Sequence, residues 1–225
     1  GSGRLTVTTG AGIGDDASGG GADADIETQV VEVALANTSG TPSGVIAIDE
    51  SDDIDIIAAT NSADDTNVGT EGISVVADGV ITVVAAGSGG SGISATDGPV
   101  SVDANTGAAD VVVNNGVVSG GGTIDLTADD SVLFSVAGDL TSSGGNVTVA
   151  ADADGNSTGQ DDGEVVRLSD NGTDDTTVID AGNGTIDIDA VGDVTLVSLQ
   201  SSNTGSSAVN IVTTGGVVDG GDQAV

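Results

Sequence analysis

The chain has 225 residues and a formal net charge of −34, because 36 acidic residues face only two basic ones, Arg4 and Arg167. It contains no His and no Cys, which excludes a disulfide framework, thiolate metal sites and catalytic triads that need an imidazole base. The negative charge also disfavours nucleic acid and anionic membranes as partners.

The composition indicates a repetitive β-structure. Apolar residues make up 37% of the chain and are mostly Val, Ile and Ala, and the only aromatic residue is Phe134. Val and Ile favour pleated, half-buried strands. Small aliphatic side chains fill a narrow and regular interior, which favours a solenoid over an irregular globule. No run approaches the roughly 18 apolar residues of a membrane span.

Short β-prone runs follow one another from the N-terminus, each ended by Gly, Asp, Ser or Asn. In 53–57, Asp53 and Asp55 alternate with Ile54 and Ile56, which predicts one polar and one buried face. The pair Asp78-Gly79 separates two apolar runs and reads as a tight turn. In the first hundred residues we expect strands at 5–8, 25–35, 44–49, 53–57, 73–77 and 80–85.

The same pattern continues to the C-terminus. No segment shows a 3.6-residue apolar period longer than one turn, so almost no helix is expected. The remaining strands are expected at 100–103, 111–113, 117–118, 123–126, 132–134, 140–141, 147–149, 165–168, 178–179, 185–188, 194–199 and 209–212.

Two stretches resemble each other internally. Residues 122–149 align without gaps on 184–211, a shift of 62, which places Val132 on Val194 and Val147 on Val209. The sequence at 117–121 also recurs, with one substitution, at 217–221. Coinciding apolar positions with modest identity are typical of the degenerate turns of a solenoid.

These observations predict an all-β fold, a parallel β-helix formed by residues 1–225 as a single repetitive segment, and we expect that segment to be a window of a longer repeat array. Strand starts about 7 to 10 residues apart give coils of about 20–30 residues, hence roughly eight to eleven turns and a rod of about 40–50 Å. The alternative is a tandem Ig-like β-sandwich, which usually needs a large buried aromatic and here has only Phe134.

The pattern GGGTIDLTADDSVLFSVAGDLTSSGGNVTVAADADG at 120–155 resembles the repeats of filamentous-haemagglutinin-type and related giant bacterial surface proteins. The phrase GDVTL at 192–196 is of the same kind. The resemblance implies a right-handed parallel β-helix in an exported adhesin or surface fibre, located outside the cell or on its surface.

Calcium is the metal that the acidic loops would suit, because it prefers hard oxygen ligands. The first loop has one-apart oxygen spacing but not the EF-hand pattern, since Ser157 and Gly163 stand where that pattern needs Gly and Glu. Solvated acidic turns are the alternative. The candidate ligands are Asp152, Asp154 and Asn156 in the first loop, Asp170, Asp174 and Asp175 in the second, and Asp161 and Asp162 between them.

No enzymatic activity is expected, and Arg167 is predicted to pair with Glu164 or Asp170. We expect a structural segment of an extracellular filament, stalk or surface layer that self-associates into a filament or sheet. An adhesin segment that binds a glycan or a surface protein is the alternative. Outward-facing Asp125 and Asp187 should repel like charges, so salt or divalent cations should favour folding. Asp189 is expected on the same face.

Overall fold

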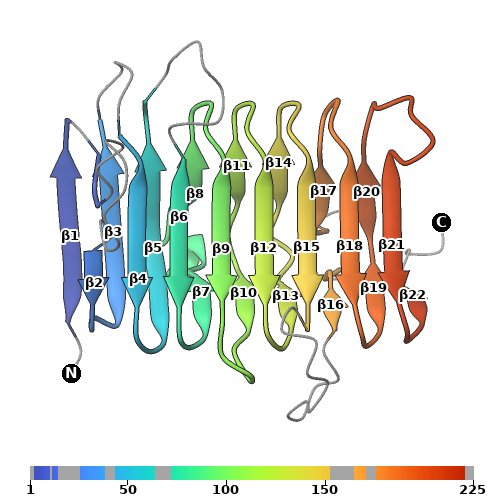
Figure 1. The fold of residues 1–225 in the computed structure, drawn as a ribbon, viewed down its shortest axis with the longest axis horizontal. Coiled ribbons are helices and arrows are strands. Elements are labelled where there is room, and N and C mark those ends of the chain that lie inside the picture. The colour runs from blue at the N-terminus through green and yellow to red at the C-terminus, as the bar shows by residue number, and fades with distance from the viewer. Residues whose placement is uncertain are drawn as a thin grey trace, which may run out of the picture.

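The computed structural model of the chain describes residues 3–10, 12–14, 26–38, 44–63, 72–152, 165–170 and 176–220. They form a parallel β-solenoid of about seven turns. The strands lie side by side along the longest axis, with β1 (Arg4–Thr9) and β22 (Val217–Asp219) at opposite ends (Figure 1). As expected, the described residues contain no α-helix, only a 3-10 turn at Ala86–Ser88.

One sheet has eight strands, so that seven turns of chain separate its first strand from its last, and each strand pairs in parallel with the next one along the stack. Along the stack these strands are β2 (Ile26–Thr28), β4 (Ile46–Glu50), β6 (Ile73–Ala77), β9 (Val100–Ala104), β12 (Ile124–Ala128), β15 (Val147–Ala151), β18 (Ile186–Ala190) and β21 (Val209–Thr213).

The second sheet has fourteen strands and begins with β1, β3 (Glu32–Asn37) and β5 (Ile54–Asn61). After β5 the sheet continues as two parallel lines of short strands. Each later turn contributes one strand to each line, except that the last turn contributes only β22 among the described residues. The first line is β7 (Ile81–Val83), β10 (Val111–Val113), β13 (Val132–Phe134), β16 (Val166–Arg167), β19 (Val194–Leu196) and β22. The second line is β8 (Gly92–Ala95), β11 (Val117–Ser119), β14 (Leu140–Ser142), β17 (Val178–Asp180) and β20 (Ser198–Gln200).

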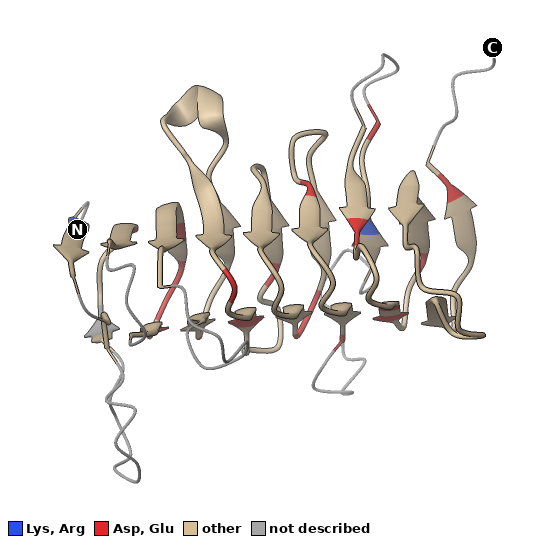
Figure 2. Cartoon of the chain, turned by 90° about the horizontal axis from the view of Figure 1, so that it is seen from above, with Lys and Arg blue, Asp and Glu red and all other residues tan. Residues whose placement is uncertain are grey.

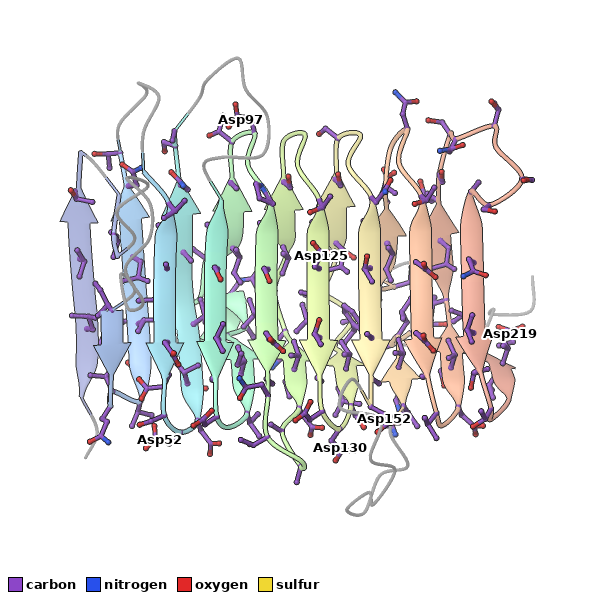
Figure 3. The ribbon with its side chains drawn as sticks, in the orientation of Figure 1. Asp52, Asp97, Asp125, Asp130, Asp152 and Asp219 are labelled. Atoms are coloured by element: carbon purple, nitrogen blue, oxygen red, sulfur yellow. The ribbon has the colours of Figure 1, made fainter. Side chains whose placement is uncertain are left out.

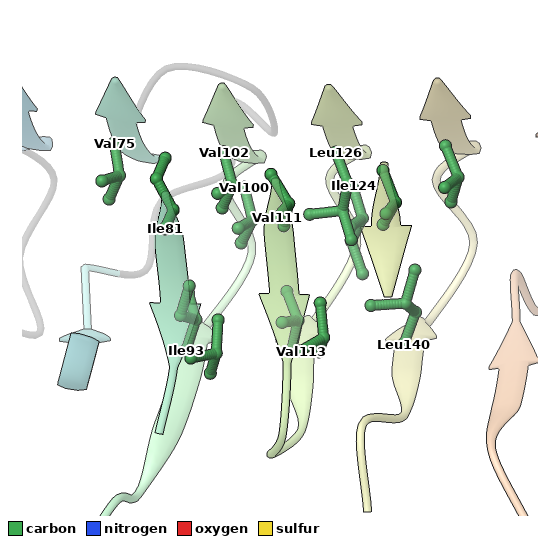
Figure 4. Packing of buried hydrophobic residues seen from close by; sticks show 14 of the residues in the cluster. Val75, Ile81, Ile93, Val100, Val102, Val111, Val113, Ile124, Leu126 and Leu140 are labelled. Carbon is green, nitrogen blue, oxygen red and sulfur yellow. The ribbon is translucent and has the colours of Figure 1, made fainter. Parts of the chain in front are cut away.

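The core lies between the two sheets and consists of columns of aliphatic side chains. Inward and outward residues alternate along each strand, and the parallel register places like positions above one another. Figure 4 shows Val102 and Leu126 of the eight-stranded sheet facing Val111 and Val113 of the other. Phe134 fills one of these inward positions and is 4% exposed. One fully buried column is Ile46, Ile73, Val100, Ile124, Val147 and Ile186.

The internal repeat found in the sequence corresponds to two turns of the stack. Val132 pairs with Val166, which pairs with Val194, and Val147 reaches Val209 through Ile186 in the same way. The second recurrence is not structural, because 117–121 and 217–221 fall in different lines of the fourteen-stranded sheet.

Several expectations about local structure were wrong. The run at 194–199 is divided between β19 and β20, which lie in different lines of the fourteen-stranded sheet, and no strand was expected where β8 lies. The run at 25–35 is not one strand, because it is divided between β2 and β3, which belong to different sheets. Asp78-Gly79 does not close a hairpin either, since it is a corner between β6 and β7 of different sheets. A Cβ on Gly79 would lie 2.7 Å from the carbonyl carbon of Asp52, so the previous turn leaves room only for glycine.

The rod is shorter than the sequence predicted. A regular turn from Ile124 to Val147 takes 147 − 124 = 23 residues, but the turn from Val147 to Ile186 takes 186 − 147 = 39. The enlarged turn (147–186) contains more residues than a regular turn but lengthens the stack by the same single strand spacing. About seven turns instead of eight to eleven correspond to a stack of about 34 Å at the usual strand spacing.

Glycines let successive backbones touch at the corner that precedes the eight-stranded sheet. Gly122, Gly145 and Gly184 each stand two residues before a strand of this sheet. A Cβ on Gly145 would lie 2.0 Å from the carbonyl oxygen of Gly122, and one on Gly184 would lie 2.0 Å from that of Gly145. These glycines therefore form a column in which no side chain fits.

Near the N-terminal end, buried amide side chains from the fourteen-stranded sheet donate hydrogen bonds to backbone carbonyl groups at the same corner. Asn37 and Asn61 are at most 1% exposed and lie in register on β3 and β5. The Asn37 Nδ2 donates to Asn61 Oδ1 at 2.9 Å, and the Asn61 Nδ2 donates to the carbonyl oxygens of Gly44 at 2.9 Å and Gly72 at 3.0 Å. The amides thus add buried hydrogen bonds to the carbonyl groups of this corner, where the oxygen of Gly72 also accepts from the backbone N–H of Ile46 at 3.0 Å.

Serines continue the same column in later turns. Ser119 and Ser142 are in register and fully or almost fully buried. Their hydroxyl oxygens lie 2.9 and 3.0 Å from the carbonyl oxygen of Gly122. Short polar side chains at this position thus bind corner carbonyl groups along the stack.

Candidate functional site: acidic corners

Many acidic side chains hold one turn to the next. Five times, an Asp or Asn directly before a strand accepts a hydrogen bond from the backbone N–H of the stacked residue in the next turn. Asp53 accepts from Val80 at 2.8 Å, and Asp193 accepts from Gly216 at 2.7 Å. The other acceptors are Asp110 for Ser131, Asp139 for Val178, and Asn146 for Thr185, at 2.8 to 3.0 Å.

These bonds give the acidic corners a structural role. An N–H at a corner lies beyond the end of the regular ladder and needs another acceptor. An ionised carboxylate is a stronger acceptor than a neutral oxygen. Part of the high Asp content therefore follows from the number of corners in the stack. Figure 3 shows Asp52, Asp130 and Asp152 along one edge of the molecule and Asp97 at the opposite edge.

Other acidic residues lie on the outer face of the eight-stranded sheet. Asp187 and Asp189 are exposed and Asp125 is half-buried, which confirms their predicted outward direction. Neutral residues separate most of them along the stack. Asp125 and Asp187 both pair with Thr148, and Asp103 lies between Val76 and Thr127 in the next column.

This spacing weakens the repulsion that stacked charges would cause. Carboxylates two turns apart are separated by about 9.6 Å, close to the screening length at physiological ionic strength. Acidic residues occur along the whole length of the rod (Figure 2). Burial raises the pKa of Asp103 above its ordinary value, since desolvation disfavours the charged form.

One acidic residue points into the core. Glu50 is fully buried at the end of β4, in register with Ala77 of the next turn. Its carboxylate accepts hydrogen bonds from the backbone N–H groups of Val30 at 3.2 Å and Ser51 at 3.0 Å. Sequence reasoning missed this residue and the buried pair Asn37 and Asn61, because polar residues at strand ends read as solvated corners.

Of the eight predicted calcium ligands, the structure describes Asp152 and Asp170, which both belong to the enlarged turn (147–186). Asp152 follows β15, is 9% exposed and has a left-handed φ of 60°. Its backbone N–H donates to the carbonyl oxygen of Asp130 at 3.1 Å. Asp170 follows β16 and forms an isolated antiparallel bridge with Thr176.

The structure places these two aspartates at different corners. Asp152 lies beside the residues that precede β13, and Asp170 follows Ser169, whose hydroxyl contacts the carbonyl oxygen of Phe134 at the end of β13. The three residues of β13, about 10 Å of extended chain, lie between these two corners. Asp154, Asn156, Asp161, Asp162, Asp174 and Asp175 lie outside the described residues.

Within the described ranges, no three acidic side chains gather in a way that could hold a metal ion. Both arginines lie on the outer face of the fourteen-stranded sheet. Arg4 forms an ion pair with Glu32, with 3.6 Å between Nε and Oε2. Arg167 is exposed on β16. Of its two predicted partners, Glu164 lies outside the described part of the chain, and Asp170 lies three residues after Arg167 in the chain.

No family model, no curated protein and no solved structure matches the chain. In the described residues, no helix has the length and apolar character needed to cross a membrane. The arrangement of the fold itself, with its stacked columns, is therefore the basis for a functional proposal.

Proposed function

We propose that this chain is a structural segment of an extracellular bacterial filament, stalk or surface layer of the filamentous-haemagglutinin type. The observation that supports this most strongly is the unbroken stack. The same column runs from Ile46 on β4 to Val209 on β21, with the first and last turns at opposite ends of the rod.

A stack of this kind suits a role in spanning distance. Every turn hydrogen-bonds to its two neighbours through parallel ladders, so the molecule lengthens by one strand spacing per turn while its cross-section stays constant. The corner carboxylates add bonds between turns in the same direction, as Asp53 does for Val80. A role in spanning distance depends only on the rod and its surfaces.

The charge supports a location in a medium that contains salt or divalent cations. A net charge of −34 on one chain opposes both folding and the approach of a second copy. Cations outside the cell would reduce that repulsion. Calcium bound by the two loops of the enlarged turn is the specific form of this proposal.

The enlarged turn also favours a second candidate, an adhesin segment that binds a glycan or a protein on another cell. Its extra residues, 153–164 and 171–175, interrupt a series of otherwise shorter turns. In solenoids, such insertions often form the binding face. Deleting 153–164 would abolish cell or glycan binding if this candidate is right, and it would leave rod formation intact.

Electron microscopy of the purified chain in millimolar calcium, and again after chelation, tests the structural proposal. We expect rods that join into filaments or sheets in calcium. Absence of any assembly across all ionic conditions, together with specific binding on a glycan array, would contradict the structural role and favour the adhesin.

A further inference from the structure

One outward column of the fourteen-stranded sheet carries apolar side chains next to an exposed cation. Val112 and Leu133 are stacked in register in the middle of the rod, and both side chains are half-buried on the outer face. Arg167 follows Leu133 in the next turn and is exposed. In stack order the column contains Glu32, Asp55, Thr82, Val112, Leu133, Arg167 and Thr195.

A hollow of about 220 Å³ opens on the same face beside Asp55. Part of its wall is apolar, since Val31 is 43% exposed there. An arginine suits such a hollow, because its aliphatic stem packs on apolar walls while its guanidinium donates hydrogen bonds to a carboxylate. The hollow is lined by Val31, Asp53, Ile54, Asp55, Val80 and Thr82.

The acidic hollow and the exposed arginine do not meet within one copy. In the described ranges, the only ion pair joins Arg4 and Glu32. Asp55 and Arg167 lie four strand spacings apart, about 19 Å, which is farther than an arginine side chain extends. Arg167 can therefore fill the hollow only in a second copy of the chain.

The column is self-complementary about Val112. Asp55 lies two strands before Val112, and Arg167 lies two strands after it. A two-fold axis parallel to the strands at the level of Val112 reverses the rod and places the column opposite its own reversed copy. Asp55 of each copy then faces Arg167 of the other, as an isologous contact requires. An axis half a strand spacing further along would instead place Arg167 opposite Thr82 and lose both ion pairs.

The other facing positions of the column are also compatible. Val112 faces itself and Leu133 faces Thr82, so the centre of the contact is largely apolar. Glu32 faces Thr195, each three strands from the axis. No two acidic residues of the column meet, which is the condition that a chain with a net charge of −34 has to satisfy at any contact with its own copy.

We propose that two copies of this chain pair side by side in opposite directions through this column, with Arg167 of each copy in the hollow beside Asp55 of the other. The contact is isologous and closes as a dimer. This inference rests on the proposed structural function and names a lateral surface through which two rods join.

The net charge sets the conditions for pairing. Two chains of −34 repel each other over long distances at low salt, and at about 0.15 M ionic strength that repulsion is screened beyond about 8 Å. Ion pairs that form in direct contact against apolar walls are screened much less. We therefore expect more dimer at about 150 mM than at about 10 mM ionic strength.

Sedimentation velocity of charge variants tests the pairing. Asp55→Arg and Arg167→Glu should each weaken association about tenfold or more, because like charges then meet at both sites. Asp55→Arg makes the net charge less negative, so a loss in this variant does not come from overall repulsion. The double variant Asp55→Arg/Arg167→Glu keeps the native net charge of −34 and should recover pairing. An equimolar mixture of the two single variants should recover it too, and failure of either to recover overturns the inference.

A matched pair of valine substitutions locates the contact. Val112→Lys places two ammonium groups at the two-fold axis, whereas Val118→Lys changes an outward residue of the same turn, 38% exposed, in the other line of the sheet. Loss of pairing in Val112→Lys alone supports the inference, with far-UV circular dichroism confirming that both variants fold.

The remaining outcomes separate this inference from the structural function. Equal losses in Val112→Lys and Val118→Lys, or a loss in Val118→Lys alone, overturn the proposed surface. If electron microscopy still shows the native chain in filaments or sheets, the structural function stands without this contact. A native chain that forms neither dimers nor larger assemblies at any ionic strength overturns both.

Discussion

Substitution of Gly122 by alanine should be strongly destabilising. A Cβ at this position would lie 2.4 Å from the carbonyl carbon of Gly98 in the previous turn. Relief to an ordinary contact requires a shift of about 1 Å between two backbones, because no flexible side chain is there to move. The nearby bond from Val100 N to Thr123 O, now 2.9 Å, would then exceed the length of a hydrogen bond.

The cost follows from these two effects. Overpacking typically costs about 1–3 kcal/mol, and one lost hydrogen bond costs about 1 kcal/mol. We therefore expect Gly122→Ala to lower the free energy of unfolding by about 2–4 kcal/mol. Urea unfolding followed by far-UV circular dichroism measures the change through the shift of the midpoint.

Gly116→Ala is the matched control. It is also a corner glycine, but a Cβ there would meet no atom within 4 Å. The substitution reduces the entropy of the unfolded chain, so it should leave stability unchanged or raise it by about 0.4–1 kcal/mol. If Gly122→Ala and Gly116→Ala unfold at the same urea concentration, the tight stacking of backbones at this corner is refuted.

Three further predictions concern single residues and cations. Asn61→Ala removes the hydrogen bonds that its Nδ2 donates to the carbonyl oxygens of Gly44 and Gly72 and those that its Oδ1 accepts from Asn37 Nδ2 and the backbone N–H of Ala63. It should cost about 3 kcal/mol in urea unfolding; a loss below about 1 kcal/mol would contradict the buried amide network. Burial raises the pKa of Asp103 in the folded state, so its ionisation destabilises the fold as pH rises through that pKa. Asp103→Asn should therefore stabilise at pH 7 and lose this gain below about pH 4, whereas a gain that does not change with pH would argue against desolvation. Calcium bound at the enlarged turn should raise the melting temperature more than magnesium at equal ionic strength, and equal shifts would indicate screening alone.

Most strand positions were predictable from the sequence because their signal is local, although β8 was missed and 25–35 and 194–199 were each expected to form one strand. Alternation such as Ile54, Asp55, Ile56 specifies one buried face without knowledge of the rest of the chain. The 62-residue repeat also gave the right columns, since stacked turns reuse like residues at like positions.

The assignment of strands to sheets was not predictable in the same way. Asp-Gly favours a hairpin and a solenoid corner alike, so Asp78-Gly79 gave no information on which sheet follows. The number of turns depended on the enlarged turn, whose extra residues look like any other polar loop. Buried Glu50 and Asn61 could have been found only by placing them in their columns, where Glu50 is followed by Ala77, and Asn61 by Ala95 and then Ser119.

Distances between spin labels on one outward column test the stacked rod most directly. The chain has no Cys, so pairs of introduced cysteines are labelled uniquely. Ala47 and Asn210 lie in the same outward column, six strand spacings apart, and Ser101 and Asn210 lie four apart.

Double electron–electron resonance on Ala47→Cys/Asn210→Cys, diluted with unlabelled chain, should give about 29 Å, and Ser101→Cys/Asn210→Cys should give about 19 Å. The difference of about 10 Å corresponds to two turns and is independent of the length of the label. Equal distances for the two pairs, or a shorter distance for the first, would contradict a single stack with its two ends at opposite sides.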